Sequence, residues 1–201
     1  MDDRIFRWAN RLADRTPWLH GFATTYAVWG IALFAVLLLA AWWDARSADD
    51  PIHAVAAVAW AASAALVGAL AVQLIGAPID RARPTAVLEG THLLLARTTD
   101  FSFPSDHGTA TAAVAVGLLL AGRQLRRRWY GGIGLGLAIL MGVVRVYAGA
   151  HYPTDVLGGL LLGSTIALVL ARPATALYAL INRRLMSSPL RALVTAAPPE
   201  I

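Results

Sequence analysis

Five uncharged, apolar runs dominate the chain. They cover residues 21–43, 54–79, 108–122, 129–144 and 156–171. A helix needs about 20 apolar residues to cross the hydrocarbon core of a bilayer, and the first two runs meet that length. The other three need an extra turn from their polar flanks, which would bring Arg145, His107 and Asp155 to the membrane boundary. Ionisable side chains at that depth are costly and usually serve a function.

The two ends of the chain have different patterns. The first twenty residues interleave apolar side chains with Arg, which predicts an amphipathic helix lying in the membrane interface. The segment after Pro173 is either a second interfacial helix or the end of a bent fifth span, and Pro198 and Pro199 predict a disordered end. We therefore expect an all-α, polytopic membrane helix bundle of five or six transmembrane helices with an interfacial N-terminal helix. Residues 1–201 are expected to form a single domain.

Composition supports a membrane protein. Of the 201 residues, 58% are hydrophobic and 14% are charged, whereas a soluble domain carries roughly a quarter charged residues. The lack of Cys excludes disulfides, thiolate catalysis and Cys-based zinc sites. All 17 basic residues are Arg. In a membrane protein, the resulting net charge of +5 reflects Arg-rich cytoplasmic loops, so we expect no nucleic-acid partner.

Antiparallel spans place alternate loops on opposite sides of the membrane. The loops 80–106 and 145–155 therefore share one side, and the Arg-rich segments 123–128 and 172–191 share the other. The Arg-rich side is expected to be cytoplasmic, although the acidic loop 44–50 also falls there. The sequence thus predicts a multi-pass protein of the plasma or inner membrane, with loops 80–106 and 145–155 on the extracytoplasmic face.

Three polar segments meet on that predicted face. They supply two imidazoles, a hydroxyl, a carboxylate and three guanidinium groups, on Arg81, Arg83, Ser105, His107, Arg145, His151 and Asp155. Guanidinium forks match tetrahedral oxyanions, and a Ser at a helix N-cap leaves free backbone N–H groups that attract anions. A His with a carboxylate four residues later is suited to nucleophilic attack. Two His and one Asp without a tight His pair make a weak metal site.

These residues resemble the three-part signature of the type 2 phosphatidic acid phosphatase family. The family pattern is Lys-x6-Arg-Pro, Pro-Ser-Gly-His and Ser-Arg-x5-His-x3-Asp. Here the corresponding segments begin at Gly76, Pro104 and Val144 and span residues 76–155. The resemblance implies a metal-free and cofactor-free lipid phosphatase domain. A soluble haloperoxidase, which shares the signature, is excluded by the hydrophobic spans.

Three positions depart from the family pattern. Gly76 stands where the family has Lys, and Val144 stands where it has Ser. Asp106 replaces the usual Gly, a variant that resembles the bacterial undecaprenyl-diphosphate phosphatase branch. Arg81 is the nearest candidate to take over the missing Lys contact to phosphate.

The resemblance also implies a role for each matching residue. His151 would be the nucleophile that forms a phosphohistidine, Asp155 would orient and charge its ring, and His107 would be the general acid. The phosphoryl group would be bound by Arg83, Arg145 and Ser105. The expected substrate is a lipid phosphate in the bilayer, foremost a polyprenyl diphosphate such as undecaprenyl diphosphate. A phosphatidate or phosphatidylglycerol-phosphate phosphatase, and a non-catalytic lipid-phosphate binding or transport protein, remain alternatives.

Overall fold

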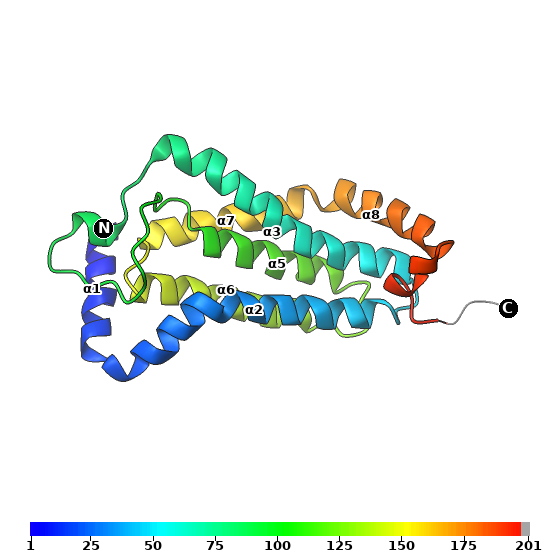
Figure 1. The fold of residues 1–201 in the computed structure, drawn as a ribbon, viewed down its shortest axis with the longest axis horizontal. Helices are drawn as coiled ribbons and strands as arrows, with labels where there is room; N and C mark the ends of the chain where they lie inside the picture. Colours follow the sequence, from blue (N-terminus) through cyan, green and yellow to red (C-terminus); the bar gives the residue numbers. More distant parts are fainter. Residues whose placement is uncertain (198–201) are drawn as a thin grey trace.

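The computed structural model describes residues 1–197 and is all-helical over that range. Its α-helices are joined by short turns and one long loop, 88–105, and Figure 1 shows the longer ones running side by side. In chain order the helices are α1 (Asp2–Arg15), α2 (His20–Ala45), α3 (Pro51–Ile79), α4 (Pro84–Val87), α5 (Asp106–Ala121), α6 (Tyr130–Tyr147), α7 (Pro153–Val169) and α8 (Ala171–Met186), with 3-10 turns at Pro17–Leu19 and Pro189–Leu193. The expectation for Pro198 and Pro199 lies outside the described residues.

The long helices coincide with the five apolar runs. Among the described residues, three helical segments are long and apolar enough to cross a membrane, namely Pro17–Ala45, Pro51–Val87 and Tyr130–Tyr147, and the pair α7–α8 would make a fourth. The apolar helix α5 is shorter, at 16 residues. The polar extensions are confirmed, because α5, α6 and α7 include His107, Arg145 and Asp155 respectively. The number of five or six spans stays a prediction.

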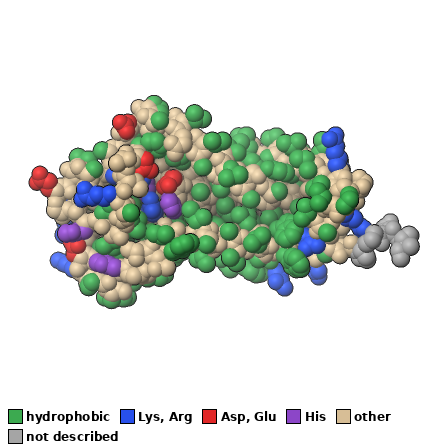
Figure 2. Space-filling model, in the orientation of Figure 1, with side chains coloured by type: hydrophobic (Ala, Val, Ile, Leu, Met, Phe, Trp, Pro, Cys, Tyr) green, Lys and Arg blue, Asp and Glu red, His purple; other side chains and the backbone are tan. Residues whose placement is uncertain are grey.

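Apolar side chains cover the middle of the molecule, and charged side chains gather at its two ends (Figure 2). Large side chains such as Trp29, Leu74 and Leu161 are about 70% or more exposed. Side chains of this kind in the middle of a bundle are stable only against lipid. The surface therefore agrees with the predicted membrane bundle.

Helix α5 lies at the centre of the bundle, packed against α3, α6 and α7. Small residues permit this close approach. A Cβ atom on Gly117 would overlap Ala61 of α3, and one on Gly163 of α7 would overlap the carbonyl oxygen of Thr109. Glycines such as Gly117 and Gly163 therefore serve helix packing, and Gly163 fixes the first turn of α5 against α7.

The C-terminal segment is a bent continuation of the fifth apolar run. Helices α7 and α8 meet at an angle of 54°. Helix α8 packs against α3, where Ser63 hydrogen-bonds Tyr178, and the indole of Trp60 in α3 donates to the carbonyl of Ala167 near the end of α7. The structure shows the bend, and the choice between an interfacial helix and the end of a bent fifth span stays a prediction.

The amphipathic N-terminal helix is confirmed as α1. It lies across the end of the bundle that also carries the loop 88–105 and the turn between α6 and α7 (Figure 1). Phe6, Ala9 and Ala13 are buried against the bundle. The side-chain amide of Asn10 donates to the carbonyl of His92 and accepts from the amide of the same residue. Helix α1 is thus fixed to the long loop by both apolar and polar contacts.

The packing of α5 on α7 predicts the effect of one added methyl group. Gly163→Ala would force Cβ into the Thr109 carbonyl, and overpacking of this kind costs about 1–3 kcal/mol. We expect the Tm in detergent to fall by about 3–10 °C. The matched control is Gly136→Ala, where nothing lies within 4 Å of the new Cβ. It should leave Tm unchanged or raise it slightly; equal Tm values for the two variants would contradict the packing described.

Candidate functional site

The polar segments meet at one end of the bundle, as the parity of the spans predicts. Backbone hydrogen bonds join them: the amide of Ser102 donates to the carbonyl of Arg81 at 2.7 Å, and the amide of Ser105 donates to the carbonyl of Asp155 at 2.9 Å. A turn at Gly149, whose φ of 82° favours glycine, returns the chain from α6 towards α7. The ends of α3, α5, α6 and α7 are therefore held around a single centre.

Ser105 is the N-cap of α5, as the sequence predicts. Its hydroxyl oxygen accepts a hydrogen bond from the amide of Gly108 at 3.3 Å, and the residue is fully buried. This cap directs the positive end of the α5 dipole towards the site. Ser105 therefore fixes the start of α5, which carries Asp106 and His107.

The imidazole of His151 is buried and its tautomer follows from its contacts. Nδ1 lies 2.8 Å from the carbonyl oxygen of Ser102. A carbonyl only accepts hydrogen bonds, so Nδ1 must carry the proton. In the neutral ring this leaves the lone pair on Nε2, the form that a nucleophilic His requires.

Two guanidinium groups flank that lone pair. Nε2 of His151 lies 3.3 Å from Nη1 of Arg83 and 3.3 Å from Nη2 of Arg145. Arg83 is held in place by Asp100 and by the carbonyl of Ala150. Burial alone would raise the pKa of the Asp100 carboxyl, but a hydrogen bond from Thr98 and the charge of Arg83 lower it below its ordinary value. Asp100 is therefore ionised at neutral pH and fixes Arg83 beside His151.

A cavity of about 290 Å³ opens in front of these groups. Its polar lining consists of Arg83, Asp100, Asp106, His107 and Arg145 together with Thr98, and its apolar lining of Ala27, Val28, Leu93, Leu95, Ala96 and Ala150. Among the described residues, the buried Nε of Arg145 has no hydrogen-bond acceptor. An oxyanion in this cavity would supply one.

His107 and Asp106 lie on the α5 side of the cavity. Nδ1 of His107 is 2.9 Å from Oδ1 of Asp106, although the two groups are not aligned for a hydrogen bond. The same carboxylate oxygen lies 3.7 Å from Nε2 of His151 and 3.9 Å from Nη2 of Arg145. Asp106, the residue that replaces the family Gly, thus stands between the two imidazoles.

Asp155 approaches His151 less closely than the four-residue spacing suggests. The nearest atoms, Oδ2 of Asp155 and Nδ1 of His151, are 4.0 Å apart. Oδ2 instead accepts from the hydroxyl of Ser102 at 2.5 Å and from the amide of Tyr152 at 2.9 Å. Asp155 is therefore linked to the ring through Ser102, whose carbonyl accepts the ring proton, and its role in orienting the ring stays a prediction.

Arg81 does not line the cavity with the other two guanidiniums. Its Nη1 donates to Asp155 and Thr154, and its Nη2 donates to Asp2. The expected phosphate contact of Arg81 stays a prediction, and these contacts indicate a different role.

Sequence reasoning missed three site residues: Ser102, Asp100 and Asp2. None belongs to a spaced motif with its partner, because the contacts join segments between 17 and 79 residues apart. The burial of Ser102 and the position of Asp2 depend on how the loop and α1 pack, and no local pattern carries that information.

A family model described as the PAP2 superfamily matches residues 56–179. That segment contains every residue of the three motifs. The chain belongs to the PAP2 superfamily. The resemblance drawn from the motifs is thereby confirmed, and the PAP2 fold of this chain is that of a multi-pass membrane protein.

Similar proteins include two curated relatives. An undecaprenyl-diphosphatase of Sulfolobus acidocaldarius is 40% identical over 85 residues, which cover 42% of this chain and 39% of the relative. The chain therefore spans well under half of that protein. A putative undecaprenyl-diphosphatase, YbjG of Escherichia coli, is 31% identical over 79% of this chain and 75% of its own length.

The PAP2 fold of the chain is also similar to a solved structure. The crystal structure of LpxE from Aquifex aeolicus superposes with a TM-score of 0.61 and 25% sequence identity, over 83% of this chain and 92% of that one. The all-helical architecture of this PAP2 chain is therefore shared along most of its length.

Proposed function

We propose that this PAP2 chain is a membrane lipid phosphatase that hydrolyses undecaprenyl diphosphate, or a close polyprenyl diphosphate, to the monophosphate. The observation that carries the proposal is the environment of His151. Its Nε2 lies between two guanidinium groups beside a cavity, and its tautomer places the lone pair on that nitrogen. The names of the Sulfolobus and Escherichia relatives support the choice of substrate.

The proposed reaction has two steps. In the first, Nε2 of His151 attacks the terminal phosphorus, the bond to the bridging oxygen breaks, and His107 gives a proton to the departing lipid monophosphate. In the second, water attacks the phosphohistidine, His107 accepts its proton, and inorganic phosphate leaves. Arg83 and Arg145 stabilise the negative charge that spreads over the phosphoryl oxygens in both steps.

The position of the cavity supports a lipid substrate. Part of its lining comes from Ala27 and Val28 of α2, and Val28 is 58% exposed on the apolar surface of the bundle. A headgroup could enter from the side while its hydrocarbon chain stays in the bilayer. A soluble phosphate ester would gain nothing from this apolar entrance.

The experiment that tests the function is phosphate release from purified lipids in mixed micelles. The panel is undecaprenyl diphosphate, phosphatidate and phosphatidylglycerol phosphate, with His151→Gln as the inactive control. We expect undecaprenyl diphosphate to be hydrolysed fastest, with activity retained in excess chelator because guanidinium groups supply the positive charge. Preference for another lipid would change the substrate, and no release from any of them would favour a binding or transport protein.

The two imidazoles should respond differently to the leaving group. His107→Ala removes a proton donor worth about 10²–10⁴-fold, and p-nitrophenolate leaves readily without that proton. We expect His107→Ala to lose most activity on the lipid diphosphate and to keep much of it on p-nitrophenyl phosphate. His151→Ala should be inactive on both. The ratio of the two rates within each variant is the measurement, and rescue of His151→Ala by the good leaving group would exchange the two roles.

We further propose that the site faces the extracytoplasmic side, because the Arg-rich loops lie at the other end of the bundle. The chain has no Cys, so a thiol reagent can label it only at a Cys introduced by substitution. Thr98→Cys, in the loop 88–105, should react with an impermeant thiol reagent in intact cells. Gln124→Cys, in the turn between α5 and α6, should react only after lysis, and the reverse pattern would invert the orientation.

A further inference from the structure

The N-terminal helix is joined to the candidate nucleophile by a continuous set of hydrogen bonds. Nη2 of Arg81 donates to Asp2 of α1 at 2.6 Å, and Nη1 donates to Asp155 at 2.5 Å. Asp155 accepts from the hydroxyl of Ser102, and the carbonyl of Ser102 lies 2.8 Å from Nδ1 of His151. Helix α1, the loop 88–105 and the start of α7 thus share one continuous set of contacts.

The buried negative charge of Asp155 explains why this set of contacts includes a cation. The side chain of Asp155 is fully buried. A buried carboxylate is stable only when it is hydrogen-bonded and paired with a positive charge, and Arg81 is the cation bonded to it. Arg81 also forms an ion pair with the carboxylate of Asp2. Arg81 is therefore held between two carboxylates.

Asp2 is itself fixed at the start of α7. Its carboxylate accepts from the amide and the hydroxyl of Thr154 as well as from Arg81. Burial alone would raise the pKa of Asp2, but these hydrogen bonds outweigh it and lower the pKa below its ordinary value. At neutral pH Asp2 is ionised, and its bond to Arg81 weakens only as the pH falls through that lowered pKa.

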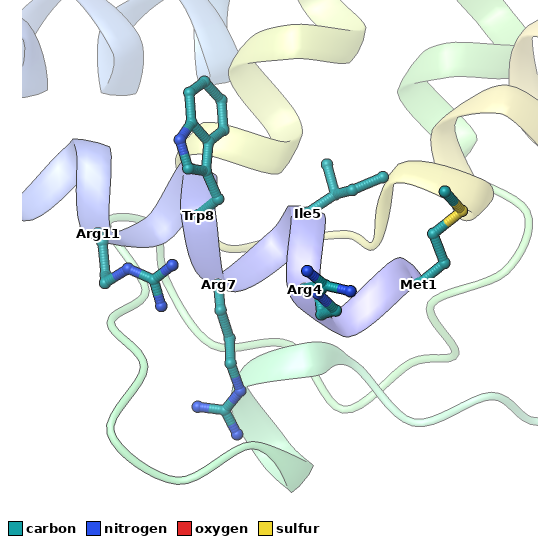
Figure 3. Close-up of a pocket in the computed structure, with 6 residues that line it drawn as sticks. All are labelled: Met1, Arg4, Ile5, Arg7, Trp8 and Arg11. Atoms are coloured by element: carbon teal, nitrogen blue, oxygen red, sulfur yellow. The ribbon is translucent and has the colours of Figure 1, made fainter.

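The rest of α1 keeps Asp2 in this place. Phe6 packs on Tyr152 with ring centroids 5.6 Å apart, and the guanidinium of Arg81 lies 4.1 Å from the centre of the same Tyr152 ring. Figure 3 shows Arg7 and Arg11 projecting from the opposite side of α1 to Trp8. These two Arg side chains and Trp8 thus lie on opposite faces of α1, as in an amphipathic helix at the membrane surface.

We infer that Asp2 and Arg81 are positioning residues, which make α1 part of the catalytic site by holding His151 through Asp155 and Ser102. This inference rests on the proposed phosphatase function. It means that Arg81 does not bind the phosphate of the substrate. The guanidinium that would replace the family Lys instead neutralises the buried Asp155. With that carboxylate fixed, the Ser102 carbonyl keeps the proton on Nδ1 of His151 and the lone pair on Nε2.

The test compares two neighbouring carboxylates on α1. Asp2→Asn removes the charge that holds Arg81, whereas Asp3→Asn removes the same charge from an exposed side chain. We expect Asp2→Asn to lower kcat on the lipid diphosphate about 3- to 30-fold, the range for substitutions along a coupled network. The inhibition constant of inorganic phosphate should stay unchanged, and Asp3→Asn should match wild type. Equal kcat values for the two variants would overturn the inference.

Substitution of Arg81 separates positioning from phosphate binding. Arg81→Ala should lower kcat about 10- to 100-fold, and Arg81→Lys should recover part of it, because an ammonium keeps the charge but not the two-sided fork. Both variants should bind inorganic phosphate as wild type does. Weaker phosphate binding with unchanged kcat would assign Arg81 to the substrate and sink the positioning role.

A measurement without substrate separates this inference from the proposed function. In protein labelled with ¹⁵N-histidine, the ring signals of His151, assigned by their loss in His151→Gln, report which nitrogen carries the proton. We expect the Nδ1–H form in wild type and Asp3→Asn, and a mixed or broadened signal in Asp2→Asn. If wild type hydrolyses no lipid, the proposed function fails, and this spectrum alone decides the positioning role. Identical spectra for all three proteins would refute it.

Discussion

The cost of burying the carboxylate of Asp155 governs the arrangement of the catalytic end. This side chain is fully buried at the start of α7, where water cannot solvate it. Its two oxygens are satisfied by Ser102, the amide of Tyr152 and Arg81. Each of these donors comes from a segment that has to be held in place. The long loop, α1 and the turn before α7 are therefore ordered around one charge.

The central helix α5 transmits this order to the second imidazole. The amide of Ser105 donates to the carbonyl of Asp155, while its hydroxyl caps α5. Glycines at the α5–α7 contact bring the two helix starts close together. His107 on α5 and His151 in the turn before α7 are consequently held at the same end of the bundle. Small-residue packing in the apolar layer thus sets the geometry of the polar groups at the boundary.

Much of this architecture could be predicted from sequence, because it depends on local patterns. Apolar runs located the long helices, and their short lengths correctly indicated that His107, Arg145 and Asp155 belong to helix ends. Ser105 was predictable as a cap from its place before an apolar run. The partners of Arg81 could not be predicted. Any of several carboxylates could pair with its guanidinium, and only tertiary packing brings Asp2 to it. Ser102 belongs to no sequence motif, because the contacts of its carbonyl and hydroxyl depend on the conformation of the loop 88–105.

The apolar entrance of the cavity beside Val28 has a kinetic consequence. A substrate that reaches His151 from within the bilayer is diluted in two dimensions, so its effective concentration is a mole fraction among the surrounding lipids. Adding inert detergent or lipid would lower the rate even when the amount of substrate per volume is constant. The affinity of such a site has to be expressed per membrane area. A weak interaction with the headgroup is sufficient for binding, because the hydrocarbon chain already confines the substrate to the membrane.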